Sequence, residues 1–300
     1  MRKFKLMIVG LLLLAVLPVH AGLQVFACEP EWAALSSAIG GDKVSVYSAT
    51  TAYQDVHRIQ ARPSLIAKVR KADLVICSGA ELEAAWLPLL LRRAANPKVQ
   101  PGKPGYLMAA MQVERLDVHQ AVDRSMGDVH GAGNPHVHLD PKRMMIIAEA
   151  LAQRLVEIDS GNTEFYQQQL LRFMQQWGDA IHKWEQQAAP LKGVEVVVHH
   201  KDWRYLLDWL GMKEVATLEP KPGLPPKAGH LSKLKQQMAE QPASMILYAN
   251  YQNKRPAVWL AEQTAIATVE LPYTVGGSEA ATDLIPLYDE IISRLLAALE

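Results

Sequence analysis

The first half of the chain alternates short apolar runs with amphipathic segments. Runs rich in β-branched and aromatic residues predict strands at 23–27, 44–48, 73–77 and 106–108. Apolar residues at helical spacing predict helices at 31–39, 64–69 and 80–93. Asp140 and Pro141 are typical of an N-cap and a first helical residue, so they predict the start of one more helix. This alternation is characteristic of a parallel sheet covered by helices.

A single long amphipathic segment follows at residues 163–187. Its large apolar side chains recur at spacings of three and four, which predicts a helix with one buried stripe. The stripe comprises Tyr166, Leu170, Phe173, Trp177, Ile181 and Trp184. At a rise of about 1.5 Å per residue this helix would exceed roughly 35 Å, which is enough to run along a whole domain.

The rest of the chain repeats the alternation of strands and helices. Strands are predicted at 194–199, 214–217, 245–249 and 268–271. Helices are predicted at 203–210, 228–240, 256–264 and 282–299. We therefore expect an α/β fold of two similar lobes, each a parallel sheet covered by helices, joined by one long rigid helix. The expected boundaries are 22–159 for the N-terminal lobe, 160–190 for the linking helix and 191–300 for the C-terminal lobe.

Residues 1–21 have the features of a secretory signal peptide. A basic start and an apolar run at 6–19 lead to small residues that end at Ala21, after which we expect cleavage and export to the periplasm. The run is short for a transmembrane span, and a retained membrane anchor is the alternative. Cleavage changes the formal charge from 0, with 31 basic and 31 acidic residues, to −3. This balance gives no electrostatic footprint for nucleic acid.

The chain has two cysteines, Cys28 and Cys77, and each ends an apolar run. If the two runs are neighbouring parallel strands, both sulfur atoms lie at the same edge of the sheet. An exported protein meets an oxidising environment, which favours a disulfide between them. Two buried free thiols are the alternative.

Three histidine motifs lie where a β-branched run gives way to a helical pattern, and they place His57, His136 and His200 at such positions. Open α/β sheets bind their ligands at the ends of strands, so these side chains are candidates for one metal site between the lobes. Zinc or a similar borderline metal is bound by neutral imidazole nitrogens. His138 is the alternative to His136, and His199 is the alternative to His200.

The other histidines are weaker candidates. His130 lies in a glycine-rich loop, from which it would deliver the metal or bind it loosely. His119, His182 and His230 are interpreted as surface residues, and His20 would be removed with the signal peptide.

The motifs together resemble one family across essentially the whole mature chain. They read Asp-Val-His at 55–57, Asn-Pro-His-Val-His-Leu-Asp-Pro at 134–141 and His-Lys-Asp-Trp-Arg-Tyr at 200–205. They are similar to the ligand motifs of the zinc- and manganese-type solute-binding proteins of bacterial ABC importers. The resemblance implies that His57, His136 and His200 bind the metal in the cleft between the lobes. It also implies a monomer that works with an importer permease and its ATPase.

Two departures from the family pattern concern the fourth ligand. Thr274 stands near the position where the family often has an aspartate, and a neutral hydroxyl is a poor zinc ligand. The fourth position would then hold water, or a carboxylate such as Glu29 or Glu219. The histidine-rich loop of many zinc-type members is also missing, and only His130 remains between Met126 and His136.

Three imidazoles and few carboxylates favour Zn²⁺ over the harder Mn²⁺, although Mn²⁺ or another divalent metal is the alternative. We therefore expect a high-affinity metal-binding protein of an importer, not an enzyme. A periplasmic metallochaperone is the first rival. A secreted zinc hydrolase is the second, but the sequence lacks His-Glu-x-x-His. Asp55 and Asp202 are the nearest candidates for its general base.

Overall fold

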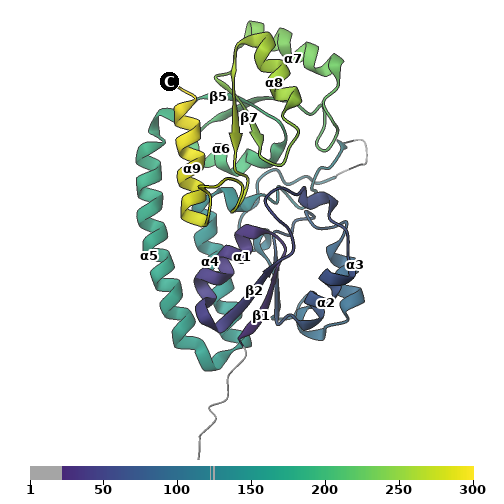
Figure 1. The fold of residues 1–300 in the computed structure, drawn as a ribbon, viewed down its shortest axis with the longest axis vertical. Helices are drawn as coiled ribbons and strands as arrows, with labels where there is room; N and C mark the ends of the chain where they lie inside the picture. The colour runs from purple at the N-terminus through teal and green to yellow at the C-terminus, as the bar shows by residue number, and fades with distance from the viewer. Residues whose placement is uncertain (1–21, 122, 124–125) are drawn as a thin grey trace, which may run out of the picture.

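The computed structural model describes residues 22–121, 123 and 126–300, and the predicted signal peptide lies outside them. The chain forms two four-stranded parallel sheets surrounded by helices (Figure 1). The α/β class and the two similar halves predicted from the sequence are confirmed. The exact lobe boundaries stay a prediction.

The N-terminal sheet has the strand order β2-β1-β3-β4. Its strands are β1 (Leu23–Ala27), β2 (Val44–Ser48), β3 (Leu74–Cys77) and β4 (Tyr106–Met108). The helices of this half are α1 (Pro30–Gly40), α2 (Pro63–Lys71), α3 (Leu87–Ala94) and α4 (Pro141–Ile158). Asp140 caps α4, because its side chain accepts hydrogen bonds from the backbone N–H groups of Lys142 and Arg143.

The C-terminal sheet repeats this arrangement with the order β6-β5-β7-β8. Its strands are β5 (Glu195–Val198), β6 (Lys213–Thr217), β7 (Met245–Ala249) and β8 (Ala267–Leu271). The helices are α6 (Arg204–Leu210), α7 (Ala228–Glu240), α8 (Arg255–Thr264) and α9 (Leu284–Ala297). Because all neighbours in each sheet are parallel, the carboxyl ends of the strands share one edge, where ligands of α/β proteins bind.

The long helix α5 (Thr163–Gln187) has the bounds predicted from its apolar stripe. It contacts α1 and α4 of the N-terminal half and α9 of the C-terminal half, and it runs along one side of the molecule in Figure 1. Trp184 stacks on Tyr288 of α9 with ring centroids 4.8 Å apart, and the Trp177 indole N–H donates to the Pro141 carbonyl. The helix is therefore packed against both halves along its length.

The hydrophobic core has one inner and two outer parts. The inner cluster is continuous across both sheets and includes Val25, Ile76, Val196 and Leu247. One outer cluster lies under α2 and α3 on the N-terminal sheet, and the other under α7 and α8 on the C-terminal sheet. The inner cluster therefore joins the two halves into one packed body.

The predicted disulfide is confirmed. Cys28 and Cys77 are bonded, with their Cα atoms 4.8 Å apart. Cys77 ends β3 and Cys28 directly follows β1, and these two strands are neighbours in the sheet.

The predicted helix at 80–93 is partly wrong. Helix α3 begins only at Leu87, and the preceding residues form turns. Gly79, Ala80 and Glu81 all have positive φ, which no right-handed helix contains. The Glu83 carboxylate accepts the Gly79 backbone N–H within this stretch, and the Trp86 indole N–H donates to the distant Val56 carbonyl, so a local bond and a tertiary contact together override its helical propensity.

Within the part of the chain that the structure describes, no helix is both long and apolar enough to cross a membrane.

Candidate metal centre

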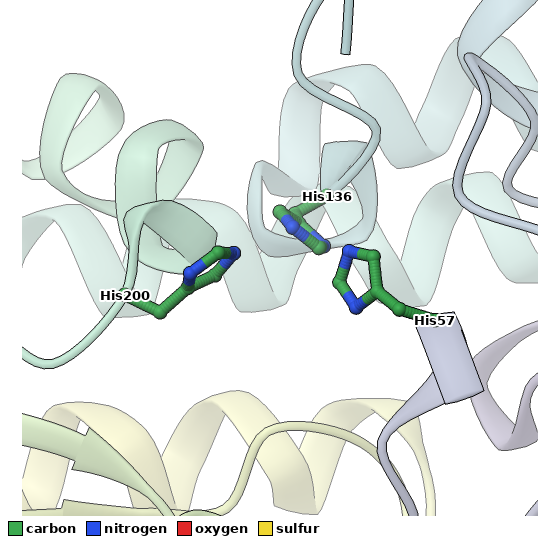
Figure 2. A group of neighbouring side chains, drawn as sticks. All are labelled: His57, His136 and His200. Carbon is green, nitrogen blue, oxygen red and sulfur yellow. The ribbon is translucent and has the colours of Figure 1, made fainter. Parts of the chain in front are cut away.

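Three histidines from distant segments of the chain lie close together near the carboxyl ends of the strands. His57 lies in the 3₁₀ turn Val56–Arg58 before α2, His136 directly precedes the 3₁₀ turn Val137–Leu139, and His200 follows β5. One ring nitrogen of each lies within 4.8 Å of the others, and Figure 2 shows the rings turned toward one another. The sequence motifs named these three residues, and the fold brings them together.

Each of the three rings has a hydrogen-bond partner at Nδ1. His57 Nδ1–H donates to Asp55 Oδ1 at 2.9 Å, and His200 Nδ1–H donates to Glu219 Oε2 at 2.7 Å. Because a carboxylate only accepts, these contacts leave Nε2 of both rings free for a metal. His136 Nδ1 lies 2.5 Å from the Tyr273 hydroxyl. The arrangement fits three Nε2 ligands whose rings are fixed from behind.

The turn that carries His136 is fixed to the segment that carries His200. Asn134 Oδ1 accepts the His136 backbone N–H at 3.1 Å, and the Asn134 amide donates to the Lys201 carbonyl at 2.9 Å. The Tyr205 hydroxyl donates to the Asn134 carbonyl at 2.7 Å. The asparagine of one motif and the tyrosine of another therefore set the relative position of His136 and His200.

Burial and mutual proximity shift the pKa values of the cluster. Burial lowers the pKa of His136 well below its usual range, and the neighbouring charges of His57 and His200 lower it further. Burial followed by the same two neighbours lowers the pKa of His130 to about 3. Burial also opposes the charged form of His200, but the hydrogen bond to Glu219 and nearby carboxylates outweigh it and raise its pKa. His136 and His130 are therefore neutral at neutral pH, as metal ligands must be.

His130 lies beside the three rings on the loop that precedes His136. Its Nε2 is 3.2 Å from His57 Nε2, and the two rings stack with centroids 5.3 Å apart. His130 is not a member of the group of nitrogens that lie within 4.8 Å of one another. A cavity of about 250 Å³ opens here and is lined by His130, His136 and His200.

Two of the alternative ligands lie elsewhere. Glu29 is buried in the N-terminal half, where its Oε2 accepts the Ser78 backbone N–H at 3.2 Å. The Thr274 hydroxyl donates to Glu31 Oε2 at 2.5 Å. Neither belongs to the group formed by the three histidines. Their sequence positions indicated the correct edge of each sheet but not the direction of the side chain.

The remaining candidates surround the site in other roles. Glu219 is the partner of His200 Nδ1. His138 points away from the three rings, because its Nε2–H donates to the Tyr273 carbonyl at 3.1 Å and its Nδ1 lies 3.3 Å from Glu31. His199 is buried beside His200 but is not in the group of three.

The three histidines interpreted as surface residues differ in their surroundings. His119 is exposed at the rim of the cavity, and His182 is exposed on α5. His230 is half-buried, and its Nε2 lies 2.9 Å from the Thr217 carbonyl oxygen.

Tyr273 contacts a candidate ligand but was not predicted from the sequence. It follows β8, in the loop where the family pattern directs attention to a carboxylate near Thr274, and no spacing in the sequence connects it to His136. Asp55, a candidate general base in the sequence, instead accepts a hydrogen bond from the ring of His57. Its Oδ1 also accepts the His57 backbone N–H at 3.1 Å, so a carboxylate two residues before the histidine was the available signal.

Two carboxylates near the candidate metal centre are engaged by imidazoles. Asp55 holds His57 and Glu219 holds His200, so both orient candidate ligand rings. Asp202 Oδ2 accepts hydrogen bonds from the Tyr251 hydroxyl at 3.2 Å and the Gln252 amide at 2.9 Å, whereas its Oδ1 is buried without a hydrogen-bond partner. Burial raises the pKa of Asp202 to about 6. The geometry at Asp55 and Glu219 therefore suits the binding of an ion.

Comparison with known families identifies the chain. The family model described as zinc-uptake complex component A, periplasmic (ZnuA), matches residues 25–300. The protein belongs to the ZnuA family. Members of this family are solute-binding proteins of ABC transporters and not enzymes.

The relatives of this ZnuA-family chain differ in the metal that their names give. The high-affinity zinc uptake system protein ZnuA of Bacillus subtilis is 23% identical over 248 residues, which cover 81% of this chain and 76% of that protein. The manganese ABC transporter substrate-binding lipoprotein scaA of Streptococcus gordonii is 27% identical over 153 residues, which cover 51% of this chain and 47% of that protein. The match therefore spans about half the length of the streptococcal relative.

Solved structures share the fold. A crystal structure of ZnuA superposes with a TM-score of 0.75 at 20% identity and covers 91% of this chain and 99% of that one. A Cd-bound periplasmic metal binding protein from Candidatus Liberibacter asiaticus gives a TM-score of 0.74 at 17% identity and covers 92% and 99%. The arrangement of two sheets and one long helix is thus the ZnuA fold.

Proposed function

We propose that this protein captures a divalent metal ion, with zinc preferred, and delivers it to the permease and ATPase of an ABC importer. The observation that carries the proposal is the convergence of His57, His136 and His200. Each has its Nδ1 held by another side chain, so the three Nε2 atoms present a ready-made coordination face. Membership of the ZnuA family supports the transport role.

The proposed ligands are Nε2 of His57, His136 and His200, with His130 as the fourth. Zinc in proteins takes four ligands in a tetrahedron, and nitrogen ligands at 2.0–2.1 Å from the metal lie about 3.3 Å apart. The His57–His130 separation of 3.2 Å already matches this value. A small inward movement of the His130 loop would complete the tetrahedron.

An all-imidazole site favours zinc over manganese. Mn²⁺ prefers carboxylate, carbonyl and water oxygens, whereas imidazole suits Zn²⁺ and Cu²⁺. The two carboxylates nearest to the ligands, Asp55 and Glu219, are held by imidazole N–H groups. They therefore add negative charge around the metal without replacing a nitrogen ligand.

The rival roles make different demands on the same site. A metallochaperone would bind the same ion but hand it to an apo-protein. A zinc hydrolase would need a general base within reach of a metal-bound water, and the two carboxylates in contact with the proposed ligands are held by imidazole N–H groups. We infer export to the periplasm, because the matching family model is described as periplasmic. We infer a monomeric protein, because the three proposed ligands all come from one chain.

Metal analysis tests the function directly. Protein purified without a tag should contain about one zinc per chain, and competition titrations should rank Zn²⁺ far above Mn²⁺. The variant His182→Ala is the matched control, because His182 is exposed on α5 and should leave binding unchanged. Preferential binding of Mn²⁺, or full binding by His57→Ala, would contradict the proposed site.

Transfer to a permease tests the transport role separately. Zinc-loaded protein should stimulate ATP hydrolysis by the partner transporter reconstituted in liposomes, and metal-free His136→Ala protein should stimulate it much less. Efficient zinc delivery to a soluble apo-protein without any effect on the transporter would support the metallochaperone instead.

A further inference from the structure

The segment 126–131, here called the clasp, lies at the metal centre and contacts both halves of the protein. On the N-terminal side, the Gly131 backbone N–H donates to Glu81 Oε2 at 2.7 Å. On the C-terminal side, the Asp128 backbone N–H donates to the Pro222 carbonyl at 2.8 Å. Between these anchors, His130 reaches His57. The clasp also lines the cavity beside the other ligand rings.

Two glycines allow the clasp and the C-terminal turn to approach closely. A Cβ added at Gly127 would lie less than 3.0 Å from the Pro222 carbonyl oxygen, and one added at Gly223 would lie equally close to the Asp128 carboxylate. Both glycines also have positive φ, of 86° and 74°. A side chain at Gly127 would therefore meet the Pro222 backbone, and one at Gly223 would displace the Asp128 carboxylate from its place against the turn.

Glu219 connects this contact to a metal ligand. Its Oε2 accepts the His200 Nδ1–H at 2.7 Å and the Gly223 backbone N–H at 2.8 Å. One oxygen atom thus holds both the ligand ring and the turn against which Asp128 packs. Displacement of this turn would therefore shift both the ring of His200 and the clasp.

We propose that the clasp is a metal-dependent closure whose opening sets the rate at which bound metal leaves. Bound metal draws His130 inward as the fourth ligand, and the Gly127–Pro222 and Asp128–Gly223 contacts hold the clasp in that position. The inference rests on the proposed function, because the closure needs a metal at the three histidines. It adds that contacts made by the clasp control how fast the bound metal dissociates. The clasp bridges the two halves, so a transporter that separates it from the Pro222 turn would free the ion.

The test measures zinc dissociation by stopped-flow mixing of zinc-loaded protein with excess chelator. Gly223→Ala should accelerate release at least ~10-fold, as expected when a group supporting a ligand is lost. Gly102→Ala is the matched control, because Gly102 has a similar φ of 82° but a Cβ there would meet nothing within 4 Å. Release from Gly102→Ala should equal that of the unmodified protein. Equal rates for the two alanine variants would overturn the proposal.

A double-mutant cycle then connects the contact to His130. His130→Ala should accelerate release to a similar extent, and Gly223→Ala should add less than its full effect in that background, because only the part transmitted through Glu219 to His200 remains. Full multiplication of the two effects would overturn the proposal. His130→Ala keeps the test decisive if Gly223→Ala folds poorly, since normal release from it would also overturn the clasp. Failure of the unmodified protein to bind zinc would instead contradict the proposed function.

Discussion

The candidate metal centre has two sides that differ in burial: a floor, formed by His136 and Tyr273, and a roof, formed by His57 and His130. On the floor, His136 and Tyr273 are only 2% and 5% exposed and lie next to the inner hydrophobic cluster. On the roof, the His57 side chain is 17% exposed, and His130 is carried by the clasp. A rigid, buried ligand loses little entropy on binding, whereas a ligand on a loop must be ordered. We therefore expect the floor to provide most of the affinity and the roof to control access.

The largest expected effect comes from the floor. His136→Ala should weaken zinc binding by more than ~100-fold, because losing a ligand costs more than losing a supporting group, which is worth about 10–100-fold. Competition titration against a chelator of known affinity measures the change. A smaller loss than in His57→Ala would reverse the ranking of floor and roof.

His138→Ala is the matched control for that variant. His138 is two residues away and equally buried, but its ring faces Glu31 and the Tyr273 carbonyl. Zinc affinity should stay within about 3-fold, while the free energy of unfolding falls by roughly 2 kcal/mol because a buried ring and its hydrogen bond to the Tyr273 carbonyl are lost. Chemical denaturation measures this fall. Loss of zinc binding with unchanged stability would show that His138, and not His136, is the ligand.

Tyr273→Phe tests how the floor is held. The hydroxyl 2.5 Å from His136 Nδ1 fixes the orientation of the ring, and its removal leaves the packing of the aromatic ring in place. Zinc affinity should fall by about 10-fold or more, within the range for such supporting groups. Isothermal titration would show this as a change in affinity with unchanged stoichiometry. Unaltered affinity would mean that packing alone orients His136.

The pH dependence of zinc binding should reflect the titration of His200. Burial lowers the pKa of His200, but the hydrogen bond to Glu219 and the nearby carboxylates outweigh burial and raise it. His200 must lose its proton to bind zinc, so affinity should rise with pH through that raised pKa and level off above it. In metal-free protein the pair adds stability that is fully present below about pH 6.5 and is lost as pH rises through the raised pKa.

Glu219→Gln sharpens this prediction. Without the carboxylate the pKa of His200 should fall, so the pH at which affinity levels off should move downward. Affinity at high pH should drop about 10-fold, since the supporting hydrogen bond is weakened. Titrations between about pH 5.5 and 8.5 bracket the unperturbed histidine value near 6.5. An unmoved curve would show that another group governs the dependence.

The smallest expected change in affinity is on the roof. His130→Ala should weaken equilibrium binding by less than ~10-fold, because water can take the fourth position and an opened clasp also speeds entry. Competition titration measures the affinity, and the His182→Ala protein supplies the baseline. A loss of affinity as large as that in His136→Ala would show that His130 contributes as much to zinc affinity as His136 does.

Much of the fold and the three central histidines could be predicted from the sequence. Strand and helix periodicities defined both sheets, and the bounds of α5 followed from the spacing of its apolar stripe. Each ligand motif combines a histidine with the residue that positions it nearby, as Asp55 does for His57 and Asn134 for His136. Hydrogen bonds between residues close in the sequence produce short motifs, and such motifs can be recognised from the sequence alone.

The rest depends on contacts between distant segments. Tyr273 lies 137 residues from His136, and Thr274 lies 243 residues from Glu31. No sequence spacing specifies such pairs. The turns at 79–86 were also missed, since a stretch rich in helix-forming residues is held by the Trp86 indole, which donates to the Val56 carbonyl 30 residues away.

The inner hydrophobic cluster ties together two sheets that are far apart in the chain. Neither sheet can lose its packing alone, since Val25 and Val196 belong to the same apolar body and α5 covers both ends of it. The protein should therefore melt as one cooperative unit. Scanning calorimetry should give a single peak whose van't Hoff and calorimetric enthalpies agree. A fragment that ends before α5 would expose half of that cluster to water and should aggregate instead of folding.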